Sequence, residues 1–313
     1  MTDPSPAPAR ELTPTQQRNL ALMRRTGDPL VFDESFIDEL VSDATDAIAE
    51  LSSMLEVVNL FVAKGWVTRV HGCEVLHLQP DDFAWKPATA AGFVAHKAIE
   101  LALNWRGEPV PAVVVDEALA RLADDANQRG SYVAGLDDGA WAELRSRAID
   151  RTTKFLQDFP PLPPAAHPVL ESNAKWRPEG TIEFSAKVDL AIGKPEGRES
   201  RLLIVDFKSG YRSHHHRDDL RFYALLETLR HRVPPRKLAT YYLDYAESDA
   251  EDVTEGTLRA ALDRTLSAIE RHIELTIEHD EPVKRVGGSC RWCPLNESCT
   301  EGAAFLRQSE ADD

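Results

Sequence analysis

The chain has 313 residues, 42% hydrophobic and 28% charged, which suits one large globular domain with a sizeable core. Its formal net charge of −16 argues against general electrostatic adhesion to nucleic acid, and it contains no run of about 18 apolar residues of the kind that crosses a membrane. The proline-rich amino terminus has no apolar stretch and does not resemble a signal peptide. We therefore expect a cytoplasmic protein without a membrane partner.

The first half of the chain is predicted to be mainly helical, after a disordered tail over residues 1–12. Residues 66–85 are expected to form short strands or extended chain, and a cluster of prolines at 160–164 ends this half. The periodic apolar pattern and plausible caps predict helices over 14–25, 34–64, 88–105, 113–128 and 137–158.

β-type runs begin after this proline cluster. Residues 182–192 and 202–207 are rich in β-formers, and turn residues at 194–197 join them, so a β-hairpin is predicted. No internal repeat or long linker demands separate domains, and the order of elements predicts an α/β fold with a small mixed sheet. The remaining predicted elements are a helix at about 215–231, a strand at 237–245 and a long helix at 254–279.

Charged side chains stand at the ends of the two predicted hairpin strands. Asp206 and Lys208 directly follow the apolar run 202–205, and the period of two along a strand puts them on one face. If Asp189, near the end of the other run, lies opposite, two carboxylates and an ammonium converge. That arrangement suits a divalent metal and phosphodiester hydrolysis. The plainer alternative is a solvated strand edge, although charges that end so apolar a strand are usually paired or functional.

The four cysteines have an uneven distribution. Cys290, Cys293 and Cys299 form a C-x2-C-P-x4-C cluster, and Cys73 is the only cysteine left to complete a set of four. Structural disulfides are rare in cytoplasmic proteins, so bound metal is favoured. Four thiolates suit either tetrahedral Zn²⁺ or an iron–sulfur cluster, and the spacing does not choose between them. Either group would tie residue 73 to the C-terminal region as a belt around the fold.

Other charged residues are weaker candidates. Basic residues gather between 201 and 240, including Arg217 and Arg221, where a solvated helix face is the plain alternative. His96 lies on an otherwise apolar helix and would by default be a core histidine. Glu171 precedes the hairpin and is a possible supporting acid.

The ordered set of motifs resembles the RecB-type branch of the PD-(D/E)XK nucleases, in particular its iron–sulfur members. These include the CRISPR-associated adaptation nuclease and the AddB-type nuclease domain. The family's Gly-x-x-x-His motif is matched by Gly92 and His96, and its Asp/Glu-x-Lys motif by Asp206-Phe207-Lys208. Its Gly-x-x-Asp motif is matched at Asp189, with Ser185-Ala186-Lys187 in place of the commoner glycine and arginine. The cysteines, one before and three after the core, follow the family's distribution.

The resemblance implies a restriction-endonuclease-like α/β core, with a small mixed sheet flanked by helices. To this core it adds an N-terminal helical elaboration and a C-terminal cysteine-cluster belt. It further implies one RecB-like domain over 13–302, followed by a tail at 303–313. Within that domain the helical part is expected over about 13–160, the β-rich catalytic core over about 165–280 and the cysteine cluster over 290–299.

The resemblance also implies a Mg²⁺- or Mn²⁺-dependent deoxyribonuclease, exonuclease-like, that acts in DNA repair or processing. DNA that is single-stranded or has free ends would be its partner, and a separate helicase is possible because the chain has no P-loop motif. The implied catalytic residues are Asp189, Asp206 and Lys208. The implied metal ligands are His96, Asp189, Asp206 and the backbone carbonyl of Phe207. A 4Fe-4S cluster, with Zn²⁺ as the alternative, would be held by Cys73, Cys290, Cys293 and Cys299.

One departure from the family pattern concerns DNA contact. The family usually carries a Gln-x-x-x-Tyr helix after the lysine strand, and Tyr223 fits, but Asp219 replaces the glutamine. A carboxylate near a phosphodiester backbone is a poor substitute for an amide, so contact with nucleic acid is assigned to Arg217, Arg221 and Tyr223 with this reservation. Two other functions stay open: a non-cleaving nucleic-acid-binding or assembly subunit of the same fold, and a zinc-stapled α/β protein of unrelated function.

Overall fold

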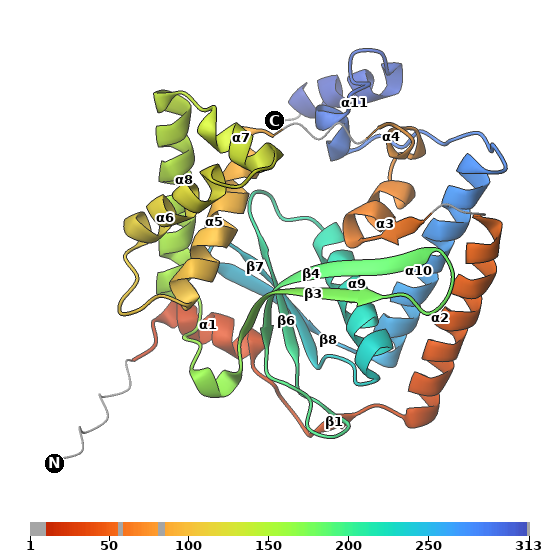
Figure 1. Ribbon diagram of the computed structural model, residues 1–313, viewed down its shortest axis with the longest axis horizontal. Helices are drawn as coiled ribbons and strands as arrows, with labels where there is room; N and C mark the ends of the chain where they lie inside the picture. The colour runs from red at the N-terminus through yellow and green to blue at the C-terminus, as the bar shows by residue number, and fades with distance from the viewer. Residues whose placement is uncertain (1–10, 56–58, 81–84, 312–313) are drawn as a thin grey trace.

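A computed structural model describes residues 11–55, 59–80 and 85–311. A mixed sheet lies at the centre, with helices against both of its faces (Figure 1). A short two-stranded ribbon joins β1 (Leu30–Val31) to β5 (Glu199–Ser200). The strands of the six-stranded sheet are β2 (Leu60–Val62), β3 (Val169–Trp176), β4 (Ile182–Ile192), β6 (Leu203–Lys208), β7 (Lys237–Tyr242) and β8 (Glu247–Asp252).

The sheet forks along β4. β3 pairs antiparallel along most of β4, and on the other edge β2 pairs parallel with its first residues while β6 pairs antiparallel with Leu190–Ile192. β7 continues parallel to β6, and β8 antiparallel to β7. Between β2 and β6 the edge of β4 has no strand partner, and there the hydroxyl of Tyr223 donates to the carbonyl of Lys187 at 2.9 Å. A backbone carbonyl that accepts no hydrogen bond would destabilise the sheet. Tyr223 supplies the missing donor and in this way closes the fork.

The helices divide between the two faces of the sheet. Alternation along β6 sends Ile204 toward α2, α3, α9 and α10, while Val205 and Phe207 pack with residues of α1, α5 and α8. Helices α6 and α7 pack with α5 and α8 around a separate apolar cluster. The helices are α1 (Pro14–Met23), α2 (Glu34–Met54), α3 (Lys64–His71), α4 (Glu74–His77), α5 (Pro87–Leu103), α6 (Pro111–Ala123), α7 (Gln128–Ala134), α8 (Asp138–Asp158), α9 (His215–His231), α10 (Glu255–Thr276) and α11 (Thr300–Ala311).

Local sequence explains where several helices begin. The side chain of Asp137 accepts from the backbone N–H of Ala140 at 2.8 Å before α8, and Thr254 accepts from Thr257 at 3.1 Å before α10. Each cap satisfies a donor that the first helical turn leaves free, which is typically worth about 1 kcal/mol. In the described part of the chain, no helix has both the length and the apolarity needed to span a membrane.

The predicted α/β class and mixed sheet are confirmed, as is the antiparallel pairing of 182–192 with 202–207. Two element predictions were wrong. The helix predicted over 34–64 ends at Met54. Residues 60–62 instead form β2, whose backbone pairs with β4. Residues 56–58 lie outside the described residues. The region predicted as extended, 66–85, forms α3 and α4, since Val67 and Val70 are buried at helical spacing; residues 81–84 lie outside the described residues.

Candidate active site and cysteine cavity

Two carboxylates and two lysines form a compact cluster at the end of β6. Asp206 is 1% exposed, with Lys64 Nζ 2.7 Å from its Oδ1 and Lys208 Nζ 3.0 Å from its Oδ2. Asp219, on α9, lies 2.9 Å from Lys208 Nζ and 4.0 Å from Lys64 Nζ. Lys208 and Asp206 thus share one face of the strand, as the sequence predicted, and α3 and α9 add one charge of each sign.

The pKa values of the cluster show that its charges stabilise one another. Burial disfavours the ionised form of Asp206, but the positive charges of Lys64 and Lys208 outweigh it and lower the pKa of this carboxyl group. Burial likewise opposes both ammonium groups, and nearby Asp206 outweighs it and raises the pKa of Lys64 and of Lys208. The Oδ2 atom of Asp206 is buried and makes no hydrogen bond, because Lys208 Nζ is close without being aligned.

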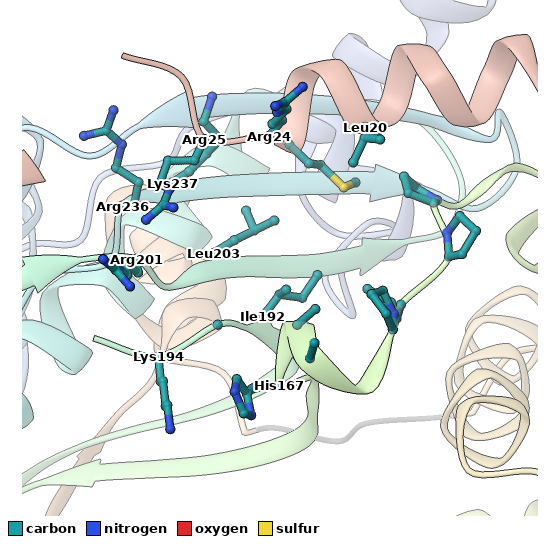
Figure 2. A pocket seen from close by; sticks show the side chains of 18 of the residues that line it. Leu20, Arg24, Arg25, His167, Ile192, Lys194, Arg201, Leu203, Arg236 and Lys237 are labelled. Atoms are coloured by element: carbon teal, nitrogen blue, oxygen red, sulfur yellow. The ribbon is translucent and has the colours of Figure 1, made fainter. Parts of the chain in front are cut away.

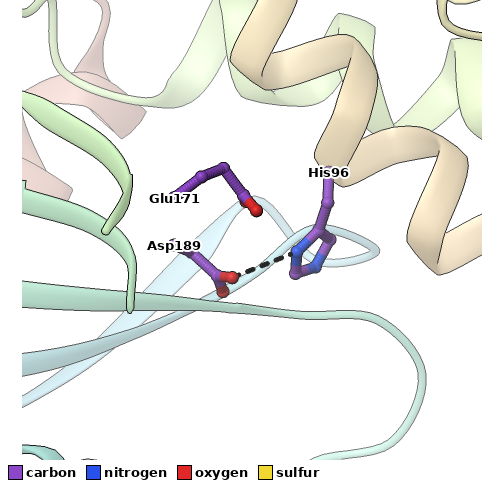
Figure 3. A group of neighbouring side chains, drawn as sticks. All are labelled: His96, Glu171 and Asp189. Carbon is purple, nitrogen blue, oxygen red and sulfur yellow. Dashed lines mark ion pairs between the residues drawn. The ribbon is translucent and has the colours of Figure 1, made fainter. Parts of the chain in front are cut away.

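A second group of side chains meets next to this cluster (Figure 3). One ligand atom each from His96, Glu171 and Asp189 lies within 4.8 Å of the others, with His96 Nδ1 3.4 Å from Asp189 Oδ1. The other oxygen of Asp189 accepts the backbone N–H of Phe207 at 2.7 Å. Because Phe207 stands between Asp206 and Lys208, this hydrogen bond fixes β4 and β6 in the register that brings the two groups side by side.

Helix α5 reaches this position because one of its residues has no side chain. A Cβ added to Gly92 would lie 2.6 Å from Oγ of Ser209, just after β6. One turn further on, His96 packs its ring edge-on against Phe207, with 5.8 Å between centroids. Burial disfavours the charged imidazole, but the Asp189 carboxylate outweighs it and raises the pKa of His96. The glycine thus allows the close approach that places the histidine beside Asp189.

Glu171 adopts a backbone conformation that is uncommon for a side-chain-bearing residue. Its φ is 51°, in the left-handed region, within an otherwise extended strand. The neighbouring pairs Leu170↔Leu190 and Ser172↔Val188 leave Glu171 facing Asp189 across the β3–β4 ladder. Such strain is usual where a side chain must be aimed at a functional position, and Glu171 here also forms an ion pair with Lys187.

The predicted site residues therefore fall into two adjoining groups. His96 and Asp189 lie with Glu171, whereas Asp206 lies with Lys208. Phe207 connects the two groups, because it stands between Asp206 and Lys208 in β6 and donates its N–H to Asp189. Lys64 was missed, because residues 34–64 were predicted as one helix. The β-type triplet Leu60-Phe61-Val62 just before it was the only local signal of a strand followed by a new helix.

The residues predicted to contact nucleic acid lie on α9. Arg217 pairs with Asp249 at 2.9 Å and Arg221 with Glu251 at 2.8 Å, both on β8. Tyr223 is 2% exposed, and Lys64 Nζ lies 4.7 Å from the centre of its ring. Tyr223 therefore closes the fork in the sheet and supports Lys64 from within the core.

Two cavities flank the candidate active site. One of about 470 Å³ is lined by Lys64, Lys175, Ser185 and Asn173 among others. The second, of about 320 Å³, is lined by His96, Glu171 and residues of α5 and α6. Both include Lys187 in their lining, so they adjoin on the two sides of that lysine.

The four cysteines line one small cavity between α4, the 284–286 segment, η2 (Gly288–Trp292) and α11. All four are free thiols. A Cβ on Gly302 would lie 3.4 Å from Cys299 Sγ and 3.6 Å from Cys290 Sγ, so the glycine leaves room between these sulfur atoms. Backbone N–H groups of Gly287 and Gly302 point at Cys290 Sγ and Cys299 Sγ, each at 3.4 Å. Residues far apart in the sequence thus meet at one lined space.

A buried glutamate holds the C-terminal segment against α4. Glu74 is 2% exposed and accepts from Arg271 at 2.8 Å, from Arg285 at 3.1 Å and from the backbone N–H of Val283 at 2.8 Å. The hydrogen bond from Arg271, more than any other interaction, lowers the pKa of Glu74 to about 2. We call these four residues the Glu74 clasp. It brings Cys73 next to the chain that carries the other cysteines.

Two buried histidines pack behind α4. His77 Nε2 lies 3.0 Å from His272 Nδ1 on α10, and the ring of Trp66 packs edge-on against both. Burial, reinforced by His272, lowers the pKa of His77 to about 4. Both rings are therefore neutral at physiological pH, with one nitrogen donating and the other accepting.

Comparison with known proteins gives one family-level match. The sequence profile of the PD-(D/E)XK nuclease superfamily matches residues 71–300, a span that contains all the described site residues except Lys64, and all four cysteines. With this match, the predicted restriction-endonuclease-like fold class is confirmed. No curated protein matches the chain.

Among solved structures the likeness is distant. A candidate exonuclease from Eubacterium rectale shares 12% sequence identity, with a TM-score of 0.43, over 72% of this chain and 84% of that protein. Rai1 from Scheffersomyces stipitis, solved in complex with (3'-NADP)+ and a calcium ion, shares 12% identity with a TM-score of 0.26 over 80% of this chain and 68% of that one.

Proposed function

Because the chain belongs to the PD-(D/E)XK nuclease superfamily, we propose that it hydrolyses phosphodiester bonds of DNA at the paired carboxylates near the sheet fork. One observation carries the proposal: Phe207, between Asp206 and Lys208, donates its N–H to Asp189. This hydrogen bond links the acid–lysine motif of β6 to the second carboxylate in a fixed register. Catalytic groups need such fixed placement, since small displacements of reacting groups cost large factors in rate.

The residues present fit a divalent metal ion. Oxygen ligands are available on Asp189 and Glu171, and a nitrogen ligand on His96, all mutually close. The buried Oδ2 of Asp206 has no hydrogen bond of its own. Together with the carbonyl of Phe207, these atoms form a mixed oxygen and imidazole set that suits Mg²⁺ or Mn²⁺. When bound, such an ion supplies Lewis acidity at a phosphate oxygen and lowers the pKa of its water.

The protein's own charges have separate tasks in this scheme. Lys208 supplies a positive charge near the carboxylates that stabilises negative charge developing on the phosphate. Asp219 holds that ammonium at 2.9 Å, so the residue that replaces the family's glutamine positions Lys208 and need not contact DNA. Lys64 holds Oδ1 of Asp206 at 2.7 Å and thereby orients the carboxylate.

The two cavities beside the site provide a path for the substrate. Their lining contributes Lys64, Lys175 and Lys187, each paired with a carboxylate of the protein, and the substrate phosphates would compete for these ammonium groups. Phosphate contacts of this kind are sequence-independent and weaken as salt rises. We propose exonuclease action on single strands or free ends of DNA, and a separate helicase would then be needed on duplex DNA.

The test is a cleavage assay on DNA labelled at either end, single- or double-stranded, with Mg²⁺ or Mn²⁺. We expect cleavage by the wild type and none by Asp206→Asn, which keeps the shape but removes the charge. Asp249→Asn, which removes a carboxylate from an exposed pair with Arg217, is the matched control and should cleave normally. Equal activity in the Asp206 variant and the wild type would overturn the proposed site.

A non-cleaving DNA-binding or assembly subunit is the second candidate. It is favoured by the ion pairs that already occupy both oxygens of Asp206. It predicts salt-sensitive DNA binding with no cleavage under any metal condition. The same assay, run beside a binding titration, separates the two functions.

We further propose that the four cysteines hold one iron–sulfur cluster, with zinc as the alternative. Their lining of a single cavity and the room left by Gly302 support a shared ligand. Purified protein should be brown, absorb at about 400 nm and contain iron and sulfide; zinc with no colour would select the alternative.

A further inference from the structure

One cavity, on the side of the sheet that α1 covers, has no role in the proposed chemistry. It encloses about 840 Å³ between α1, the 159–167 segment, the loop after β4 and the starts of β6 and β7 (Figure 2). Ile192 and Leu203 in its wall belong to the strands that carry Asp189 and Asp206. They stand about 10 Å further along those strands, at the end away from the carboxylates.

The inner wall of this cavity is apolar. Prolines and aliphatic side chains dominate, and no asparagine, glutamine, serine, threonine, tyrosine or tryptophan is among the lining residues. A nucleobase needs such neutral hydrogen-bonding partners, so the wall suits a hydrocarbon or plain aromatic body instead. The apolar lining consists of Leu20, Met23, Phe159, Pro160, Pro161, Leu162, Pro163, Ala165, Ala166, Ile192, Gly193, Pro195 and Leu203.

The rim, in contrast, is cationic. Figure 2 shows Arg24 and Arg25, which directly follow α1, on one side and Lys194 and His167 on the other, with Ile192 and Leu203 of the apolar wall between them. Six lining residues are lysine or arginine, whereas Glu196 is the single carboxylate among them. This excess of positive charge stands on a strongly acidic protein, where cations are in the minority.

Several of these cations have unused hydrogen-bonding capacity. Arg25 and Arg201 are paired with Glu199, but the side chains of Arg24 and Lys194 make no polar contact with any described residue. The Nε atoms of Arg201 and Arg236 are buried and have no acceptor. A buried donor without a partner costs free energy, which an anionic ligand would recover.

We propose that this cavity binds a small amphipathic anion, with a carboxylate or phosphate head on an apolar body. The head would lie at the rim between Arg24 and Lys194, and the body would pack against the proline-rich wall. The volume is within the usual range for sites of small molecules. This inference does not depend on nuclease activity, because binding can be measured on protein that cleaves nothing.

The test uses anilinonaphthalene sulfonate, which joins an anionic head to an aromatic body and fluoresces when bound. We expect saturable binding of one probe per full-length chain, displaced by decanoate and at least about tenfold less well by uncharged decanol. Deoxyadenosine monophosphate distinguishes the source of the head group: competition equal to that of decanoate would assign the site to nucleotides. Failure of both anions to displace the probe, or equal displacement by decanol, would overturn the proposal.

Variants locate the binding in this cavity. Arg24→Glu and Lys194→Glu should each weaken decanoate binding about tenfold, the scale of one charge-assisted contact. Arg18→Glu reverses a charge on α1, outside the cavity lining, and should bind normally. Ala165→Trp fills the cavity from an exposed position that the fold does not need, and should abolish binding with an unchanged melting temperature. Normal binding by Ala165→Trp would place the probe elsewhere and end the proposal.

Discussion

The carboxylate site and the cysteine cavity are built in opposite ways. Asp189, Asp206 and Lys208 sit on regular strands, and each has a protein partner that offsets its charge. The cysteines stand in or beside short helices and turns, and the sulfur atoms of Cys290 and Cys299 each have a backbone N–H group at 3.4 Å. Contacts within the protein therefore hold the side chains of the carboxylate site in place. We expect the arrangement of the cysteines to depend on the group that they bind.

The largest effect should follow from opening the cysteine cavity. Cys73→Ser should lose the bound cluster, and with it about 3 to 5 kcal/mol of unfolding free energy, because a ligand that binds only the folded state adds to its stability. Thermal unfolding and iron and sulfide content measure the two losses together. Ser298→Ala, a substitution within the same segment, is the control and should change neither. Full iron and sulfide in the Cys73 variant would show that the four cysteines do not act as a set.

In the carboxylate site we expect a variant that loses catalytic rate but keeps the divalent metal ion. Lys208→Ala should lower turnover by about two to three orders of magnitude, the usual effect of removing one positioned electrostatic donor. Binding of Mn²⁺, followed by calorimetry, should persist because no ligand has been removed. Arg147→Ala removes an exposed arginine paired with Glu143 on α8, away from the carboxylate site, and should leave the rate unchanged. Wild-type turnover in the Lys208 variant would show that this lysine is not catalytic and serves only as the ion-pair partner of Asp219.

The Glu74 clasp lies beside the cysteines but, like the carboxylate site, it is held by contacts within the protein. Glu74→Gln keeps the shape but removes the charge that Arg271 and Arg285 share, so we expect about 2 kcal/mol less stability. Denaturant unfolding measures it. Glu301→Gln, which breaks an exposed pair with Lys284, should cost far less. Equal costs in the two variants would mean that the cysteine-bound group alone holds this segment.

The last expected effect is on the pH dependence of the free energy of unfolding. His77 has a folded pKa of about 4, below the unfolded value of about 6.5, so the unfolded chain binds a proton first as pH falls. Stability should therefore fall by about 2 kcal/mol between pH 7 and pH 5. His77→Phe should remove that part of the pH dependence, while His279→Asn, at an exposed position, should retain it. The same slope in wild type and His77→Phe would assign the acid sensitivity to other groups.

Sequence reasoning succeeded where the signal was local and failed where it depended on distant partners. The apolar run that ends in Asp206-Phe207-Lys208 predicted both a buried strand and a shared face, and both are present. Lys64 could not be predicted, since its role depends on β2 pairing with β4, a contact across more than 100 residues of chain. Its neighbouring strand is too short to outweigh the helical pattern before it.

The positions of Arg217 and Arg221 teach a related lesson. As a basic run in the sequence they suggested a free surface for nucleic acid, but their carboxylate partners lie on β8, a strand that was not predicted. Glu171 was considered only as a supporting acid, because nothing in the sequence indicates that a glutamate will adopt a left-handed conformation facing Asp189. Charges can be counted from the sequence, whereas their pairing is a property of the fold.

The Glu74 clasp also has a consequence for how the protein is made. Its residues come from opposite ends of the sequence, so Glu74 leaves the ribosome well before Arg271, Val283 and Arg285 exist. At a synthesis rate of about 5 to 20 residues per second, the delay is roughly 10 to 40 s. During that time α4 lacks the segment that covers it, and Cys73 is an accessible thiol on a nascent chain. This part of the fold therefore cannot close until residue 285 has been synthesised, and a chain truncated before residue 285 cannot complete the clasp.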